Sequence, residues 1–399
     1  MSLTVAGLSV LSMVACTGNN NSNTSASGTT FKAGLITLHD ENSTYDKNFI
    51  DAFKAACTKM GVTAVIATGV DEGEAAYTKA AELVDAGCKF VFADSFGHES
   101  YILKAAKEFE AVQFSHATGT TAHTAGVSNF HNAFASIYEG RYLAGVAAGL
   151  KLKAMIEADA TTSHNIGYVG AYPYAEVKSG YTSWYLGVKS VVEDVTMSVK
   201  FTNSWYDETA EKNAANDLIT SGCSIISQHA DSWGAPTACE TAGVPNVTYN
   251  GSTESRCPDT YLISSKVNWE PYFEYAIGQV QKGESIDTDW TGTLASDFTS
   301  GSVALTEPGK KAAVDGTSTK LEEVATKLRN KTLRVFDCST FTVGGQHLTS
   351  YKADVDTDAA YTPDTEVIKT EGGITYFAES EYRSAPYFDI DIDGITKLN

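Results

Sequence analysis

The sequence predicts an α/β protein of two doubly wound lobes, each a parallel sheet covered by helices, with a C-terminal extension. Short apolar runs alternate with amphipathic helical segments from residue 32 onward, and the alternation starts again near residue 165. Continuous apolar strands separated by helices are typical of parallel sheets buried on both faces. The chain of 399 residues is also too long for one ordinary domain.

The first set of elements is expected within residues 31–150. Its strands are predicted at residues 33–38, 62–67, 89–93 and 112–115, with helices from about residue 46 to 60 and at 75–86, 99–109 and 134–152. Phe49, Phe53 and Ala56 fall at helical spacing, and Gly87 ends the second helix.

The second set is expected within residues 151–249. Its strands are predicted at residues 165–170, 196–201, 223–227 and 245–249, with helices ending near 193 and at 208–221 and 233–242. We expect residues of about 250–310 to return to lobe 1. Residues 311–399 should form an extension on that lobe, with β structure after residue 340.

The N-terminus carries a separate signal. An apolar run, Leu3 to Ala15, ends at Cys16 and is shorter than the roughly 20 residues that span a bilayer. Small residues before a cysteine are typical of a bacterial lipoprotein signal, so Cys16 is the expected lipidation site. Residues 17–30 are mainly Asn, Ser, Thr and Gly and suit a flexible tether. A buried N-terminal strand is the alternative.

Charge and cysteine content restrict the function further. The net charge of −20 disfavours binding to nucleic acid or to anionic lipid headgroups. No cysteine or histidine cluster has zinc-site spacing. Cys239 and Cys257 flank one predicted strand and are the best candidates for a disulfide.

The residues that follow the predicted strands suggest a ligand site. Ligands of open α/β sheets bind outside the carboxyl ends of the strands. Here aromatic rings stand beside carboxylates and amides, a combination that suits a flat polar ring held by stacking and in-plane hydrogen bonds. Asp46 is alternatively a helix cap. The candidate ligand-binding residues are Tyr45, Asp46, Phe49, Ser95, Phe96, His116, Trp205, Gln228, Asp231, Asn250, Asn268 and Trp269.

Seven short motifs carry a family resemblance between about residues 32 and 335. They are Asp-Lys-Asn-Phe at 46–49, Phe-Ala-Asp-Ser-Phe-Gly at 92–97, Phe-Ser-His-Ala-Thr-Gly at 114–119, Tyr-Glu-Gly-Arg-Tyr-Leu-Ala-Gly at 138–145, Ile-Gly-Tyr-Val-Gly at 166–170, Asn-Ser-Trp-Tyr-Asp at 203–207 and Gln-His-Ala-Asp-Ser at 228–232. The chain resembles the basic membrane protein (BMP, PnrA-like) substrate-binding lipoproteins of ABC importers. This resemblance implies a periplasmic-binding-protein type I fold, an ABC permease as partner, an extracytoplasmic lipid-anchored location and a purine base or nucleoside as ligand.

The resemblance also implies residue roles. Asp46 would contact the purine, Phe49 would stack on it, and Trp205 would cover its other face. Ile50 and His116 stand where nucleoside-binding members contact the ribose, so the resemblance favours a free base such as adenine. No cofactor is implied.

The same kinds of residue also occur in the sites of other functional classes. A sugar or autoinducer receptor of the same fold also uses aromatics and carboxylates. A nucleoside-cleaving enzyme is the alternative from another class, although no catalytic motif is present. His98, His116 and His229 with nearby aspartates form a weak acid–base or metal candidate. Asp389, Asp391 and Asp393 resemble the start of a calcium loop.

Overall fold

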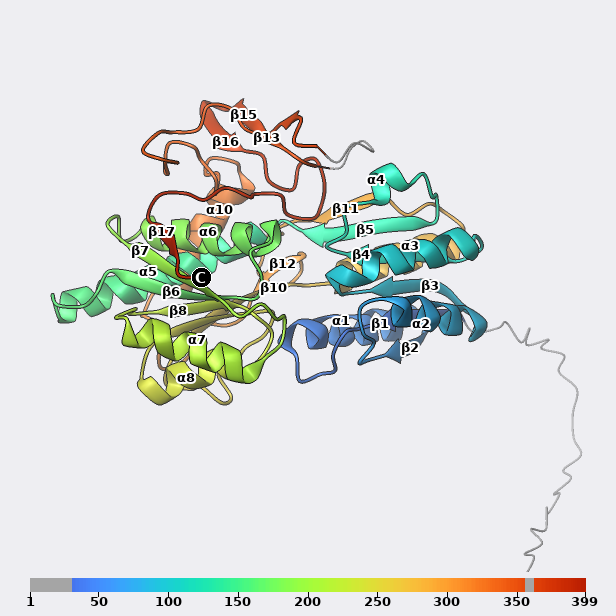
Figure 1. Ribbon diagram of the computed structural model, residues 1–399, viewed down its shortest axis with the longest axis horizontal. Helices are drawn as coiled ribbons and strands as arrows, with labels where there is room; N and C mark the ends of the chain where they lie inside the picture. Colours follow the sequence, from blue (N-terminus) through green and yellow to red (C-terminus); the bar gives the residue numbers. More distant parts are fainter. Residues whose placement is uncertain (1–30, 356–361) are drawn as a thin grey trace, which may run out of the picture. The chain divides into compact units, whose positions relative to one another are not determined.

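The structure is a computed structural model that describes residues 31–355 and 362–399. The expected lipidation site Cys16 and tether 17–30 lie outside these residues. Two parallel sheets, each covered by helices on both faces, form the two lobes (Figure 1). The predicted α/β fold class and two-lobe arrangement are confirmed. No helix of the described residues is long and apolar enough to cross a membrane.

The first lobe contains a six-stranded sheet in the order β11-β5-β4-β3-β1-β2, with parallel pairing throughout. Side chains alternate across β3, so Phe90 and Phe92 face the core under α1 and α9 while Val91 faces α2 and α3. The strands are β1 (Lys32–Ile36), β2 (Thr63–Ala67), β3 (Cys88–Ala93), β4 (Gln113–Ala117), β5 (Phe130–Ala135) and β11 (Asp289–Gly292), and the main helices are α1 (Thr44–Met60), α2 (Glu74–Asp85), α3 (Glu99–Glu108) and α9 (Glu270–Lys282).

The second lobe contains a seven-stranded sheet in the order β12-β10-β9-β8-β6-β7-β17, parallel except for β12. Helices α5 and α6 pack closely because Gly145 and Gly187 each face backbone of the other helix, where no Cβ would fit. The strands are β6 (Asn165–Gly170), β7 (Thr196–Phe201), β8 (Ile226–His229), β9 (Asn246–Tyr249), β10 (Tyr261–Val267), β12 (Val303–Leu305) and β17 (Ile395–Lys397), and the helices are α5 (Ile137–Ala158), α6 (Ala175–Lys189), α7 (Glu208–Thr220) and α8 (Gly234–Ala242).

The lobe boundaries differ from those expected. Strands β10 and β12 join the second sheet, whereas residues of about 250–310 were expected in lobe 1; only α9 and β11 from this stretch lie there. Helix α5 packs mainly on α6 of lobe 2 rather than on the lobe assigned to residues 31–150. Periodicity predicts the type of an element but not the sheet that an edge strand joins, which explains the difference.

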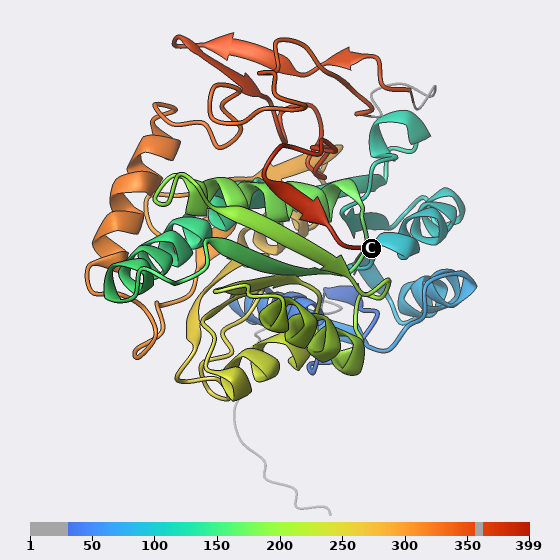
Figure 2. The same ribbon diagram turned by 60° about the vertical axis from the view of Figure 1, so that its left-hand side comes forward.

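The C-terminal extension contacts both lobes rather than lobe 1 alone. Its last strand, β17, pairs with β7 (Figure 2). Lys178 of α6 forms ion pairs with Asp389 and Asp391 at 2.5 and 3.2 Å. The Ser384 amide donates to Asp289 of β11 at 2.8 Å. The extension also contains α10 (Thr317–Arg329), β13 (Lys352–Ala353), β14 (Thr365–Glu366), β15 (Ile368–Glu371) and β16 (Ile374–Phe377).

Two sequence expectations find no counterpart among the described residues. Cys239 and Cys257 are buried free thiols and do not form the candidate disulfide. The calcium-loop aspartates have other partners, since Asp389 and Asp391 bind Lys178 and Asp393 accepts backbone amides of Gly344 and Gly345. No cluster of three or more metal-ligating side chains occurs in the part of the chain that the structure describes.

Candidate ligand-binding site

A cavity lies between the lobes at the carboxyl ends of the strands. It holds about 370 Å³ of empty space, including its opening to solvent. Leu38, His39, Tyr45, Asp46, Ser95, Phe96 and Thr118 of lobe 1 and Glu176, Trp205, His229 and Asp231 of lobe 2 line it.

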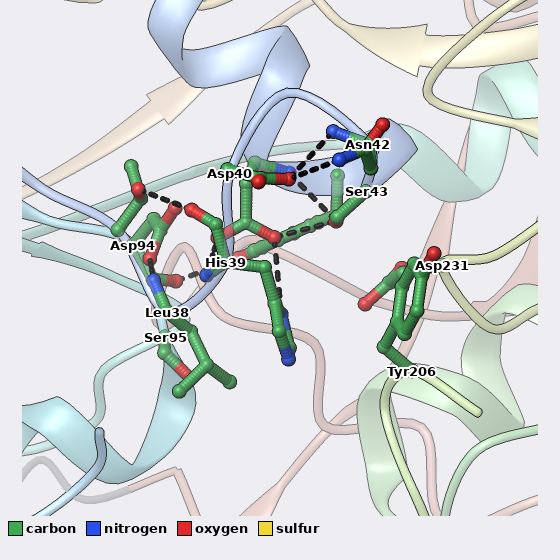
Figure 3. A network of polar contacts seen from close by, with 12 residues as sticks. Leu38, His39, Asp40, Asn42, Ser43, Asp94, Ser95, Tyr206 and Asp231 are labelled. Carbon is green, nitrogen blue, oxygen red and sulfur yellow. Dashed lines mark hydrogen bonds and ion pairs between the residues drawn. The ribbon is translucent and has the colours of Figure 1, made fainter. Parts of the chain in front are cut away.

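Contacts across the cavity hold the lobes together. The Thr44 amide of lobe 1 donates to the backbone oxygen of Asp231 at 3.0 Å. His39 faces Tyr206 of lobe 2, with ring centroids 5.4 Å apart (Figure 3). Ligand sites occur preferentially at such interfaces between lobes.

Asp46 is fixed by the N-terminus of α1. Ser43 caps this helix, and its hydroxyl accepts from the Asp46 amide and donates to the Asp46 carboxylate at 2.5 Å. The His39 amide donates to the same carboxylate at 2.7 Å. Burial raises the pKa of Asp46, but hydrogen bonds from His39 and Ser43 outweigh it and the net pKa is lowered. Asp46 is therefore an ionised acceptor, and Ser43 rather than Asp46 caps the helix.

Two further carboxyl groups have raised pKa values, in contrast to Asp46. Burial raises the pKa of Asp94 and Asp231 well above the ordinary value, and the negative charge of Asp46 adds to both shifts. One Asp94 oxygen accepts from the Leu38 amide and the other is buried without a partner. A neutral carboxyl both donates and accepts hydrogen bonds, so Asp231 complements a ligand edge that carries a donor and an acceptor.

Aromatic rings enter the cavity from both lobes. The Tyr45 hydroxyl donates to the Asp94 backbone oxygen at 2.8 Å, which holds the ring at the start of α1. Trp205 follows β7 and packs edge-on against Tyr172 at 5.1 Å between centroids. At the mouth, the half-exposed rings of Phe96 and Tyr174 stack at 5.4 Å, one from each lobe.

His229 and Glu176 complete the wall in lobe 2. The His229 Nε2 atom lies 3.4 Å from Glu176 Oε1, and both side chains are nearly buried. Burial lowers the pKa of His229, the Glu176 hydrogen bond raises it and the Arg141 charge lowers it, leaving a net lowered pKa. The imidazole is therefore neutral near pH 7.

The family model of the ABC transporter substrate-binding protein PnrA-like family, Bmp, matches residues 36–335. The chain belongs to the Bmp family. This family is a class of solute-binding proteins that work outside the cytoplasm with an ABC permease. The predicted family membership is confirmed.

Two curated relatives match part of this Bmp protein. A purine-binding protein of Brucella abortus is 36% identical over 204 residues, covering 51% of the chain and 55% of the relative. A putative ABC transporter glucose-binding protein of Haloferax volcanii is 32% identical over 203 residues, covering 51% and 49%. The chain thus matches about half the length of each relative.

Solved structures share the fold. A solute-binding protein of Conexibacter woesei superposes with a TM-score of 0.62 at 18% identity, over 76% of this chain and 98% of its own. One from Aeropyrum pernix has a TM-score of 0.63 at 15% identity, over 77% and 93%. At these identities the likeness concerns the fold alone.

Half of the predicted site residues of this Bmp protein line the cavity. They are Tyr45, Asp46, Ser95, Phe96, Trp205 and Asp231. All of them follow a strand or open the helix after it. This agrees with the rule that ligands of open α/β sheets bind outside the carboxyl ends of the strands, which we call the strand-end rule.

Phe49 and Trp269 lie elsewhere. They are 0% and 1% exposed and stack on each other at 4.4 Å between centroids, inside the core of lobe 1. Phe49 lies one helical turn after Tyr45, so Tyr45 rather than Phe49 faces the cavity from α1. The expected stacking role of Phe49 does not fit this structure.

The four remaining predicted residues, His116, Gln228, Asn250 and Asn268, do not line the cavity. His116 is bonded to the Ser95 backbone oxygen at 2.6 Å, and the Gln228 amide donates to the Ala230 and Ser232 backbone oxygens. The Asn268 amide donates to Thr299 and Gly301. Asn250 and Asn268 line a separate surface groove beside α1.

Five lining residues were missed by the sequence prediction. Glu176 follows β6 and His229 ends β8, so the strand-end rule could have identified both. The other three, Leu38, His39 and Thr118, also follow strands, but no sequence pattern separates them from ordinary loop residues. From sequence, His229 belongs to the motif at 228–232 and to the weak acid–base or metal candidate.

Proposed function

We propose that this protein captures a purine between its two lobes and delivers it to an ABC permease. The observation that carries the proposal is the cavity in which Tyr45 and Trp205 enter from opposite lobes beside the carboxyl groups of Asp46 and Asp231. Stacking rings fix the plane of a flat ligand, and the carboxyl groups bind its N–H and ring-nitrogen edges. The purine-binding Brucella relative supports this ligand class.

Within the purines, we favour a free base. Ile50 is buried in the core of lobe 1, and His116 is engaged by Ser95. Neither side chain lines the cavity at the positions where the family resemblance would place ribose contacts. A nucleoside remains within the proposed class.

Binding without turnover and a lipid anchor at Cys16 complete the proposal. The anchor is tested by comparing detergent-phase partition of the full chain with that of a Cys16→Ser variant. Turnover is tested by incubation with adenosine and chromatography for free adenine, whose appearance would contradict a pure binding role.

A thermal-shift and calorimetry panel tests the ligand. Adenine, guanine, hypoxanthine, adenosine and glucose are each added at 100 μM. With a Kd of about 1 μM, the bound purine stabilises the fold by about 2.7 kcal/mol. Stabilisation by glucose alone would overturn the purine assignment in favour of the ligand class named for the Haloferax relative.

A further inference from the structure

Arg141 is a charged side chain buried behind the cavity. It is 0% exposed, and its Nη1 atom donates to the Gln228 backbone oxygen at 3.1 Å. Its guanidinium carbon lies 3.7 Å from the ring centroid of Tyr249. Its Nε and Nη2 atoms are buried without a hydrogen-bond partner. Because a guanidinium stays protonated, its charge acts on the groups around it.

His229 is the neighbour through which this charge reaches the cavity. A Cβ atom on Gly180 of α6 would lie 3.1 Å from His229 Nδ1 and 3.4 Å from Arg141 Nε, so both nitrogens face the same gap beside Gly180. His229 also packs on Tyr249, with centroids 4.8 Å apart. Its Nδ1 atom is buried without a partner, and its Nε2 atom points to Glu176.

The two neighbours of the His229 imidazole determine which of its nitrogens carries the proton in the neutral form. A guanidinium has only hydrogen-bond donors, so the nitrogen that faces it is stable only as a lone pair. A carboxylate has only acceptors, so the nitrogen near Glu176 is stable only as N–H. Both neighbours therefore select the tautomer with the proton on Nε2.

We propose that Arg141 is a positioning residue for ligand recognition, which keeps His229 neutral with its proton on Nε2 and so leaves Glu176 free to accept from the ligand. This inference rests on the proposed function. Glu176 then holds the His229 N–H and still has lone pairs that can accept from a ligand donor. The exocyclic amino group of adenine is such a donor.

Other charged and titratable groups face the same place and define the controls. Glu176 lies on α6, Arg141 on α5, Tyr168 on β6 and Tyr249 on β9, while Asp231 follows β8. Across the cavity are the groups of lobe 1, namely His39, Asp46 and Asp94. His39 is the other histidine of the cavity lining, so pH experiments are repeated in a His39→Asn background.

The tautomer is measured directly on the wild-type protein. Nitrogen-15 NMR of labelled histidines, assigned with a His229→Gln variant, is expected to show His229 protonated on Nε2 and not titrating between pH 5.5 and 8, a range chosen about the ordinary pKa of histidine. A proton on Nδ1, or titration of His229 within that range, would overturn the proposal without any mutation of Arg141.

The role of Arg141 is measured through the pH dependence of adenine binding. In Arg141→Met, His229 can gain a proton and form an ion pair with Glu176, which removes the acceptor from the ligand. We expect the Kd of this variant for adenine to rise about tenfold from pH 8 to pH 5.5, in addition to any rise that the wild-type protein shows over the same range. Arg141→Lys, which keeps the charge, should remove most of that extra dependence.

Two further variants separate this role from folding. Gly180→Ala places a methyl group between His229 and Arg141 and should give a weaker version of the same pH effect while both residues remain. Arg141→Met/His229→Gln should lose the extra pH dependence. Arg256→Met is the matched control, because Arg256 also lies over an aromatic ring, that of Trp233, outside the cavity lining.

The outcomes distinguish this inference from the proposed function. If no purine binds the wild-type protein, the ligand assignment fails, but the NMR experiment still tests the tautomer. If adenine binds and Arg141→Met folds with an unchanged pH profile, Arg141 has only a structural role and the inference is wrong.

Discussion

Substitution of Trp269 discriminates a core residue from a site residue, because the sequence alone suggested that both Trp269 and Trp205 bind ligand. Trp269 is 1% exposed and stacks on Phe49 at 4.4 Å, with further ring contacts to Phe92, Phe134 and Phe273 at 5.5–6.3 Å between centroids. Nothing in the described structure places it on the cavity lining. We therefore expect Trp269→Ala to reduce stability and leave the intrinsic affinity for purine unchanged.

The magnitude follows from the buried area of the indole ring. About 200 Å² of aromatic surface at roughly 25 cal/mol per Å² gives about 5 kcal/mol, an upper estimate because the unfolded chain already buries part of it. This agrees with the 3–5 kcal/mol typical of Trp→Ala in a core. Trp269→Phe, which keeps a ring on Phe49, should cost about 1–2 kcal/mol.

Urea unfolding and calorimetry measure the two effects separately. The unfolding midpoint of Trp269→Phe should fall without a change in m-value, and adenine titrated well below the transition should bind with the wild-type Kd. An unchanged midpoint together with a tenfold or greater loss of affinity would show that Trp269 contacts the ligand and that the core assignment is wrong.

Three other predictions follow from described contacts. Trp205→Ala should abolish the purine-induced thermal shift while lowering the free energy of unfolding by no more than about 1–2 kcal/mol, since Trp205 is only partly buried; an unchanged shift removes Trp205 from the site. Burial raises the pKa of Glu211 to about 7, so its folded form retains a proton that the unfolded chain loses above about pH 4.5, and this contribution to stability is lost as pH rises from about 4.5 to 7. The free energy of unfolding, measured by urea titration, should fall from pH 5 to 8, and this fall should be about 2 kcal/mol smaller in Glu211→Gln. Identical pH profiles would contradict the assignment. Ending the chain after Asp393 removes β17 and opens the edge of β7, so light scattering should show a larger mass than for the full chain; an unchanged mass would show that the edge is otherwise protected.

The fold could be predicted from sequence because its signals are local. Apolar runs such as 89–93 and helical spacings such as Phe49 to Phe53 depend on neighbours in the chain and define strands and helices directly. The lobe assignment of β10, β12 and β17 depends on pairing between distant segments, which periodicity does not contain.

The site could be predicted from sequence only for residues that follow strands. Asp231 and Trp205 follow strands, and the strand-end rule places them at the cavity. Phe49 and Trp269 share the same aromatic character, but Phe49 lies one turn deeper along α1 than Tyr45 and stacks on Trp269 in the core. Arg141 lies inside α5 in the motif at 138–145, but that motif does not reveal its role, and only the three-dimensional arrangement brings Arg141 behind His229.

The C-terminal extension links the two lobes through a short segment. It is attached to lobe 1 where Ser384 binds Asp289 and to lobe 2 where Asp389 binds Lys178. The intervening segment can span at most about 17 Å when fully straightened. Lobe opening that exceeds this reach has to break the Ser384 hydrogen bond or the Lys178 ion pair. The extension thus limits how far its two attachment points can separate while both contacts are kept.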